Sequence, residues 1–185
     1  MRAVTPPPLQ QGVLDMACGL YAVVNAAWVI RPRAASMEFA RKVKAAFTHT
    51  DWRHSDWLLS EGLSRNQVNK MLIIASHLLS EAGYQSLEIR RPFWSSTDVT
   101  LEQFKEAVLG AFTSAGVAVV AQFNGSDSDG SWSHWTVIRG RTPKLLQLYD
   151  SLGSKTMALS KLVDEDVEPV RGNWSIRPAS LFVVT

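Results

Sequence analysis

The longest apolar run of the chain covers residues 19–30, with Asn25 inside it. A run of this length is too short to span a bilayer, which takes about 20 residues, and fits a helix buried on all sides. Asp15 stands just before the run as a candidate N-cap, and Pro32 follows it, where proline cannot continue the hydrogen-bond ladder of a helix. We therefore expect a buried helix over residues 17–30, with Cys18 in its first turn.

Helical patterns fill the first half of the chain and strand patterns fill the second half. Thr100 and Gln103 form a capping-box pattern, and Gly83 is a helix stop. This order predicts an α+β fold in which helices precede an antiparallel sheet. Further helices are expected over residues 36–47, 64–82 and 100–114, strands over 85–91, 117–123, 132–139, 145–149 and 180–184, and a flexible loop over 124–131.

Length and composition limit the classes of protein to consider. The 185 residues suit one domain, 1–185, and 46% of them are hydrophobic, enough for a full core. A net charge of +2 without a basic stripe argues against a nucleic-acid partner. A single cysteine excludes an intramolecular disulfide and a cysteine-based zinc cluster. With no export signal and no spanning segment, we expect a cytoplasmic chain as synthesised, with later delivery as an effector left open.

Cys18 is the candidate nucleophile. At the N-terminus of a helix, the positive end of the helix dipole and unpaired N–H groups favour the thiolate form of a cysteine. Gly19 follows directly, and we expect its missing side chain to let a substrate carbonyl approach closely. The Cys18 N–H and the side-chain amide of Gln11 can supply the two donors of an oxyanion hole.

His134 is the candidate base and Asp150 its partner. His134 begins one expected strand and Asp150 ends the next, so an antiparallel hairpin makes them cross-strand neighbours. Asp150 is then expected to accept the Nδ1–H of His134 and to fix its tautomer. A structural cysteine, a packing histidine and a turn-forming aspartate are the plain alternatives for each residue taken alone. The presence of all three residues in this order and spacing favours a catalytic site.

Three segments carry a resemblance to a known group of proteins. Gln11-x6-Cys18-Gly-Leu-Tyr, His134-Trp and Tyr-Asp150-Ser-Leu together resemble the papain-like superfamily of cysteine peptidases. The order Cys, His, Asp is that of papain and of the bacteriocin-processing peptidases. The local residues are similar to the adenovirus protease and the ubiquitin-like-protein peptidases, whose order is His, Asp, Cys. Relative to those, this chain is permuted. The resemblance covers about 45 residues.

The resemblance implies a papain-like fold, with a nucleophile helix packed on a C-terminal sheet. It also implies that Cys18 is the nucleophile, His134 the base, Asp150 the orienting carboxylate and Gln11 the oxyanion donor. Papain and most relatives separate glutamine and cysteine by six residues. Here Gln11 is seven away, as in the adenovirus type, and Gln10 is a rival.

The implied function is a cysteine peptidase or isopeptidase that hydrolyses amide bonds of a protein or peptide through a thioester. A glutamine deamidase or acyltransferase effector could use the same residues, and an inactive binding module remains the non-enzymatic alternative. We expect no cofactor, since the sequence has no nucleotide loop, flavin motif or metal motif. His49 and His54 flank Asp51 but lack a cysteine or a third ligand, so we expect no metal. Oligomeric state stays open.

Overall fold

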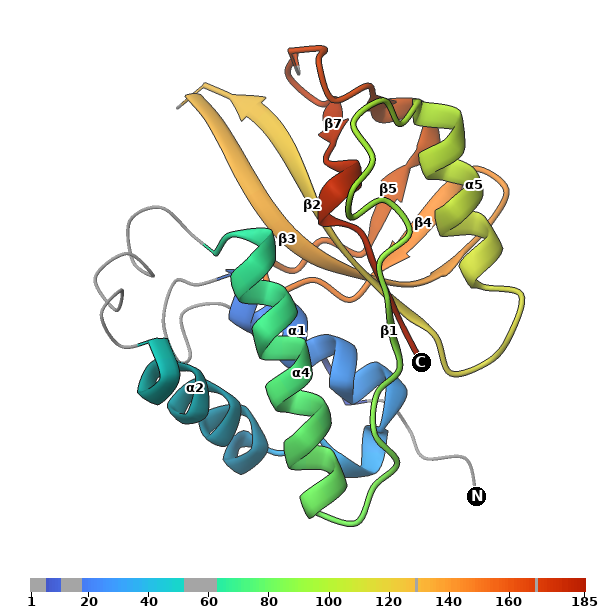
Figure 1. Ribbon diagram of the computed structural model, residues 1–185. Helices are drawn as coiled ribbons and strands as arrows, with labels where there is room; N and C mark the ends of the chain where they lie inside the picture. The colour runs from blue at the N-terminus through green and yellow to red at the C-terminus, as the bar shows by residue number, and fades with distance from the viewer. Residues whose placement is uncertain (1–5, 11–17, 52–62, 129, 169) are drawn as a thin grey trace.

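The computed structural model of the protein describes residues 6–10, 18–51, 63–128, 130–168 and 170–185. Within these ranges the chain forms helices packed against a largely antiparallel sheet, as the α+β expectation requires (Figure 1). The helices in the first half of the chain gather on one face of the sheet and a later helix covers the other. Their bounds are α1 (Cys18–Ile30), α2 (Met37–Asp51), α4 (Arg65–Glu81) and α5 (Leu101–Ala111).

The helix ends follow local sequence signals. α1 ends at Ile30, before Pro32 begins a single 3₁₀ turn, η1 (Pro32–Ala34). Ser64 caps α4 through a reciprocal hydrogen-bond pair with Gln67, and Gly83 follows the helix with a φ of 79°. A left-handed backbone of this kind favours glycine, so the expected stop is confirmed.

Polar caps also begin α2 and α5. The Phe39 amide donates to the Ser36 hydroxyl at 3.1 Å at the start of α2. Thr100 and Gln103 form the expected capping box of α5. The Leu101 amide donates to Asp164 Oδ1 at 2.8 Å, which ties this helix end to the second half of the chain.

The sheet has the strand order β1-β8-β2-β3-β4-β5, and β7 pairs with β2 and β6 beside this path. All pairs are antiparallel except β6 with β7. The strands are β1 (Ile89–Arg90), β2 (Ala118–Asp127), β3 (Gly130–Arg141), β4 (Leu145–Leu148), β5 (Thr156–Ala158), β6 (Leu162–Val163), β7 (Trp174–Ile176) and β8 (Phe182–Val184).

Alternation along the central strands divides the core into two apolar clusters. On β2, Ala118 and Val120 belong to the cluster that contains α1, α2 and α4, whereas Val119 and Ala121 belong to the cluster under α5. This is the two-residue period of a strand buried on both faces, and it explains why residues 117–123 read as a continuous apolar run.

The expected loop over residues 124–131 is wrong. β2 and β3 continue as a paired hairpin as far as Asp127 and Gly130, which projects beyond the rest of the sheet (Figure 1). Aromatic packing compensates for the polar composition, because the Trp132 ring lies against the backbone of Gly125 and packs edge-on against Trp174 at 4.9 Å.

Two other sequence expectations need correction. The strand expected over residues 85–91 contracts to Ile89–Arg90, which pairs only with β8 at one edge of the sheet. α2 extends beyond the expected end at residue 47 to Asp51 and so includes His49. The expected cap Asp15 lies outside the described residues.

Candidate active site

Cys18 is the first residue of α1 and the chain's only cysteine. Its side chain is half-buried, whereas the residues that follow it, Gly19 to Trp28, are buried. α1 packs against β3 along the sheet face that contains Trp135 and Val137. The thiol therefore lies at the tip of a buried helix, where backbone N–H groups are not used by the helix itself.

Packing against Leu63 and Val68 gives a reason for glycine at position 19 that the sequence did not suggest. A Cβ at this position would lie 2.7 Å from Leu63 Cδ1 and 3.1 Å from Val68 Cγ2. The missing side chain therefore makes room for Leu63 and for the start of α4. Trp135 Nε1 donates to the Leu63 carbonyl at 2.8 Å, so this contact also joins α4 to β3.

His134 lies buried in β3 and binds Asp150. Its Nε2 is 2.6 Å from Asp150 Oδ1. We expected Nδ1 to face the carboxylate, so this detail is wrong. Since Nε2 is engaged by Asp150, Nδ1 is the ring nitrogen that remains for Cys18.

The strand register explains why Nε2 of His134, and not Nδ1, meets Asp150. Ile138 pairs with Leu148, and the Tyr149 amide donates to the Val137 carbonyl at 2.7 Å. Continuing this register places Asp150 opposite Thr136, two residues from His134 and diagonal to it. Nε2 is the ring nitrogen farther from the backbone, so it is the one that spans the diagonal.

The carboxylate of Asp150 is held from two sides. Its Oδ1 meets His134, while its Oδ2 accepts hydrogen bonds from the backbone amides of Leu152 at 3.1 Å and Ser154 at 3.4 Å. Gly153 permits this turn with a φ of 87°, and its own amide donates to the Asp150 carbonyl. The turn after β4 thereby aims one carboxylate oxygen at the imidazole.

Burial and partner charges act against each other at His134. Burial disfavours the imidazolium, but hydrogen bonds and charge interactions with Asp150 and Cys18 outweigh it and raise the pKa of His134 from 6.5 to about 9. The influence of Cys18 on this pKa places the thiol within interaction range of the ring. At neutral pH the imidazole therefore carries a proton between two acidic partners.

Asp150 shows the complementary effect. Burial favours its neutral form, yet the hydrogen bond and charge of His134 and the Leu152 amide hold the pKa of this carboxyl below its usual value. The buried Thr136 hydroxyl acts in the same direction, although its contact lies outside normal hydrogen-bond geometry. Thr136 was missed from the sequence. Only the β3–β4 register places it at the site.

The segment 6–10 leads toward the candidate site and is fastened at two points. The side-chain amide of Asn25, buried in α1, accepts from the Leu9 amide at 2.8 Å and donates to the Leu9 carbonyl at 3.2 Å. The Tyr149 hydroxyl donates to the Pro6 carbonyl. Asn25 thus braces the fold by hydrogen bonding, as a buried polar residue in this helix should.

Of the two glutamines considered as oxyanion donors, the structure describes only Gln10. Gln11 lies outside the described residues. Gln10 is exposed, and its side-chain amide donates to the Pro8 carbonyl at 3.2 Å, with its oxygen near Gly153. Gln10 is therefore engaged in its own segment, beside the turn that holds Asp150.

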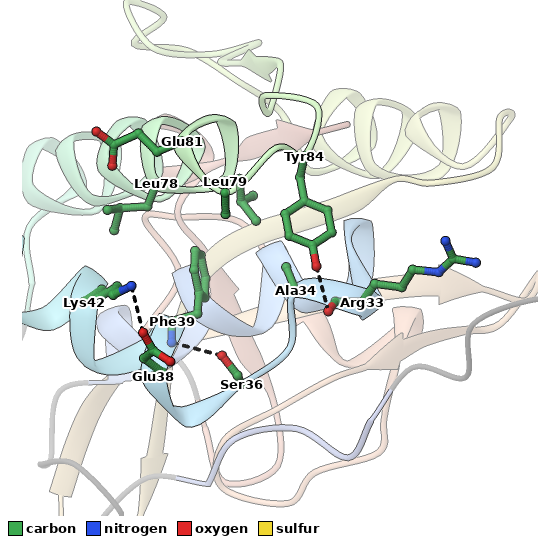
Figure 2. A pocket seen from close by; sticks show the side chains of 11 residues that line it. Arg33, Ala34, Ser36, Glu38, Phe39, Lys42, Leu78, Leu79, Glu81 and Tyr84 are labelled. Carbon is green, nitrogen blue, oxygen red and sulfur yellow. Dashed lines mark hydrogen bonds and ion pairs between the residues drawn. The ribbon is translucent and has the colours of Figure 1, made fainter.

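A cavity of about 460 Å³ lies away from these residues, between α2, α4 and the turn at Tyr84 (Figure 2). Its apolar floor includes Phe39 and Leu79, and Glu38 and Lys42 on its rim pair with each other at 2.8 Å. The cavity contains none of Cys18, His134 and Asp150. We place the chemistry at the buried ionic cluster, because a satisfied rim pair offers no reactive group.

Comparison with known proteins adds no relative. No family model, no curated protein and no solved structure matches the chain. Among the helices of the described residues, none has the length and apolar character needed to cross a membrane. Within the same residues, no group of three or more His, Cys, Asp and Glu side chains is arranged to hold a metal ion.

The geometry therefore defines an α+β protein with a cysteine at a helix tip and a buried histidine that meets a buried carboxylate. The raised pKa of His134 favours its protonated form. Such an arrangement can hold a thiolate and deliver a proton to a neighbouring atom. The roles of the individual residues stay predictions.

Proposed function

We propose that the chain is a cysteine hydrolase of the papain-like type that cleaves amide bonds of a protein or peptide. The observation that carries the proposal is the position of His134, which interacts with Cys18 on one side and lies 2.6 Å from Asp150 on the other. A histidine with this partnership can serve first as acid and then as base. A reducing compartment such as the cytoplasm suits a mechanism that needs a free thiol.

Acylation begins with the Cys18 thiolate beside the His134 imidazolium. The sulfur attacks the carbonyl carbon of the amide, and the electron pair of the C=O bond moves to oxygen. The Cys18 N–H points to this oxyanion, and we assign the second donor to Gln11 from the sequence. As the oxyanion collapses, the C–N bond breaks, His134 gives its proton to the leaving amine, and a thioester remains.

Deacylation reverses the proton transfer. Neutral His134 takes a proton from water, whose oxygen attacks the thioester carbon, and the C–S bond breaks to regenerate the thiolate. Asp150 stays ionised throughout, because its lowered pKa opposes protonation. Its contribution is to hold the imidazole and to stabilise the imidazolium.

The test is to incubate the full chain with a mixture of unmodified peptides and follow all products by mass. We expect new shorter peptides with wild type and none with Cys18→Ala. Because Cys18 is the only cysteine, a thioester trapped by acid quenching must add its mass to this residue. Peptides that gain about one dalton without shortening would mark glutamine deamidation instead, and an unchanged mixture would contradict the proposal.

A further inference from the structure

A second cavity, of about 300 Å³, borders Asp150 directly. The segment containing Pro8 and Gln10 forms one wall, and the end of β4 with the turn through Ser154 forms the other. This places the cavity at the end of the Cys18–His134–Asp150 row that lies farthest from the sulfur. Its volume is that of a small ligand or of one or two side chains.

Two cations line this cavity, Arg139 from β3 and Lys155 from the chain just before β5. Both side chains are exposed, and within the described ranges neither has a carboxylate partner. Asp150 also lines the cavity, but its ion pair is with His134 and not with either of these cations. The cavity therefore presents uncompensated positive charge.

The positions of the cations are fixed by their surroundings. The Arg139 guanidinium lies over the Tyr149 ring at 5.5 Å from its centroid, which restrains the side chain beside the cavity. The Lys155 carbonyl accepts from the Leu148 amide at 2.9 Å, which fixes the backbone that carries the ammonium. The opposite wall is held by the hydrogen bonds of Asn25 to Leu9.

We infer that this cavity is a substrate subsite for an anionic side chain, the carboxylate of an aspartate or glutamate residue. The inference rests on the proposed function, because the cavity adjoins the row of reacting groups. A guanidinium and an ammonium on one rim match a carboxylate in charge, while Pro8, Leu148 and Tyr149 provide apolar surface for its methylene stem. The preferred substrate carries an acidic residue a few positions from the scissile bond.

Binding can be measured without turnover in the full-length Cys18→Ala variant. The probes are two fluorescent glycine- and alanine-based peptides that differ only in a central run of glutamates or of glutamines. Anisotropy at physiological salt should give a Kd about fivefold lower for the glutamate peptide, as two partly exposed charge pairs allow. The two peptides have the same shape, so the ratio reports charge.

Arg139→Gln and Lys155→Gln should each bring this ratio closer to one. Lys144→Gln, at the turn that joins β3 to β4 and outside the cavity, should leave it unchanged, and a thermal melt of each variant verifies folding. Equal affinity for the two peptides, or a preference that survives both cavity substitutions, would overturn the inference. Acidic binding without any cleavage by wild type would instead overturn the proposed function and leave the anion site standing.

Discussion

The imidazole of His134 interacts with two titratable side chains. Its Nε2 meets Asp150, Cys18 helps to raise its pKa, and the residue is 5% exposed in β3. A proton on this buried ring is held by the neighbouring side chains rather than by solvent. The consequence is that changes in the neighbours alter the chemistry of the ring without touching it.

Asp150→Asn tests the carboxylate at this scale. The asparagine oxygen can still accept from the Leu152 and Ser154 amides, which turns its NH₂ group toward His134 Nε2. Nε2 must then accept rather than donate, so the ring takes the wrong tautomer and loses its stabilising charge. We expect a fall in kcat of about 10³–10⁴ with the fold intact, measured by steady-state kinetics and circular dichroism. Unchanged turnover would remove Asp150 from the mechanism.

The three residues of the candidate site that the structure describes were named from the sequence, because cysteine, histidine and aspartate are the types that the proposed chemistry needs. The ring nitrogen that meets Asp150 was not, because it depends on a strand offset between Ile138 and Gly140 that no residue type announces. The packing of Gly19 was also not predictable, because its contact with Leu63 joins segments far apart in sequence.

Single helices, strands and turns position these residues. The turn after β4 requires the most specific backbone conformation. Gly153 at φ 87° allows two amides to point at Asp150 Oδ2. Gly153→Ala should cost about 1–2 kcal/mol in the free energy of unfolding from strain and also lower kcat. Gly116 is the matched control, since it has φ 72° and open space around it but lies far from the site in sequence and structure.

Comparing Gly153→Ala with Gly116→Ala separates the effect of backbone strain from an effect on catalysis. Gly116→Ala should lose similar stability in chemical denaturation and keep full activity. If both variants keep full activity, the turn has no part in aiming the carboxylate.

The start of α1 gives a second test at the level of elements. Gly19→Ala should destabilise the protein by about 1–3 kcal/mol, because its Cβ would overlap Leu63. Gly110 lies within α5 with nothing in Cβ contact, so Gly110→Ala should instead raise stability by about 0.5–1 kcal/mol. Urea denaturation of the pair measures both. A neutral Gly19→Ala would return Gly19 to the role of leaving room for substrate.

Element boundaries were predictable where a cap or a stop stands in the chain, as at Thr100 and Gly83. They were not predictable where tertiary packing overrides composition. The hairpin that ends at Asp127 and Gly130 has the sequence of a loop. Its own Trp132 packs against Trp174, which comes from a distant part of the chain.

The described part of the chain forms one sheet with helices and an apolar cluster on each face, and the ionic pair His134–Asp150 is buried. Helices followed by strands predicted this α+β arrangement. The pairing of β1 with β8 and of β7 with β2 joins segments far apart in sequence, and no local pattern specifies it.

The buried pair links global stability to pH. The folded protein holds the His134 proton more tightly than the unfolded chain, since the pKa rises from 6.5 to about 9. This stabilisation is complete below pH 6.5 and is lost as pH rises through about 9, at roughly 1.4 kcal/mol per pH unit at most. We expect the free energy of unfolding to fall over this window in wild type and to fall less in His134→Gln. The same pH dependence of the free energy of unfolding in both proteins would contradict the link between His134 protonation and stability.

The reactivity of Cys18 toward iodoacetamide across pH tests the central claim most directly, because intact mass reads the modification of the chain's single cysteine. A thiolate held by the His134 imidazolium should react rapidly well below pH 7, and His134→Ala should abolish that advantage. A wild-type rate that rises only near pH 8–9, as for an unassisted thiol, would contradict the account.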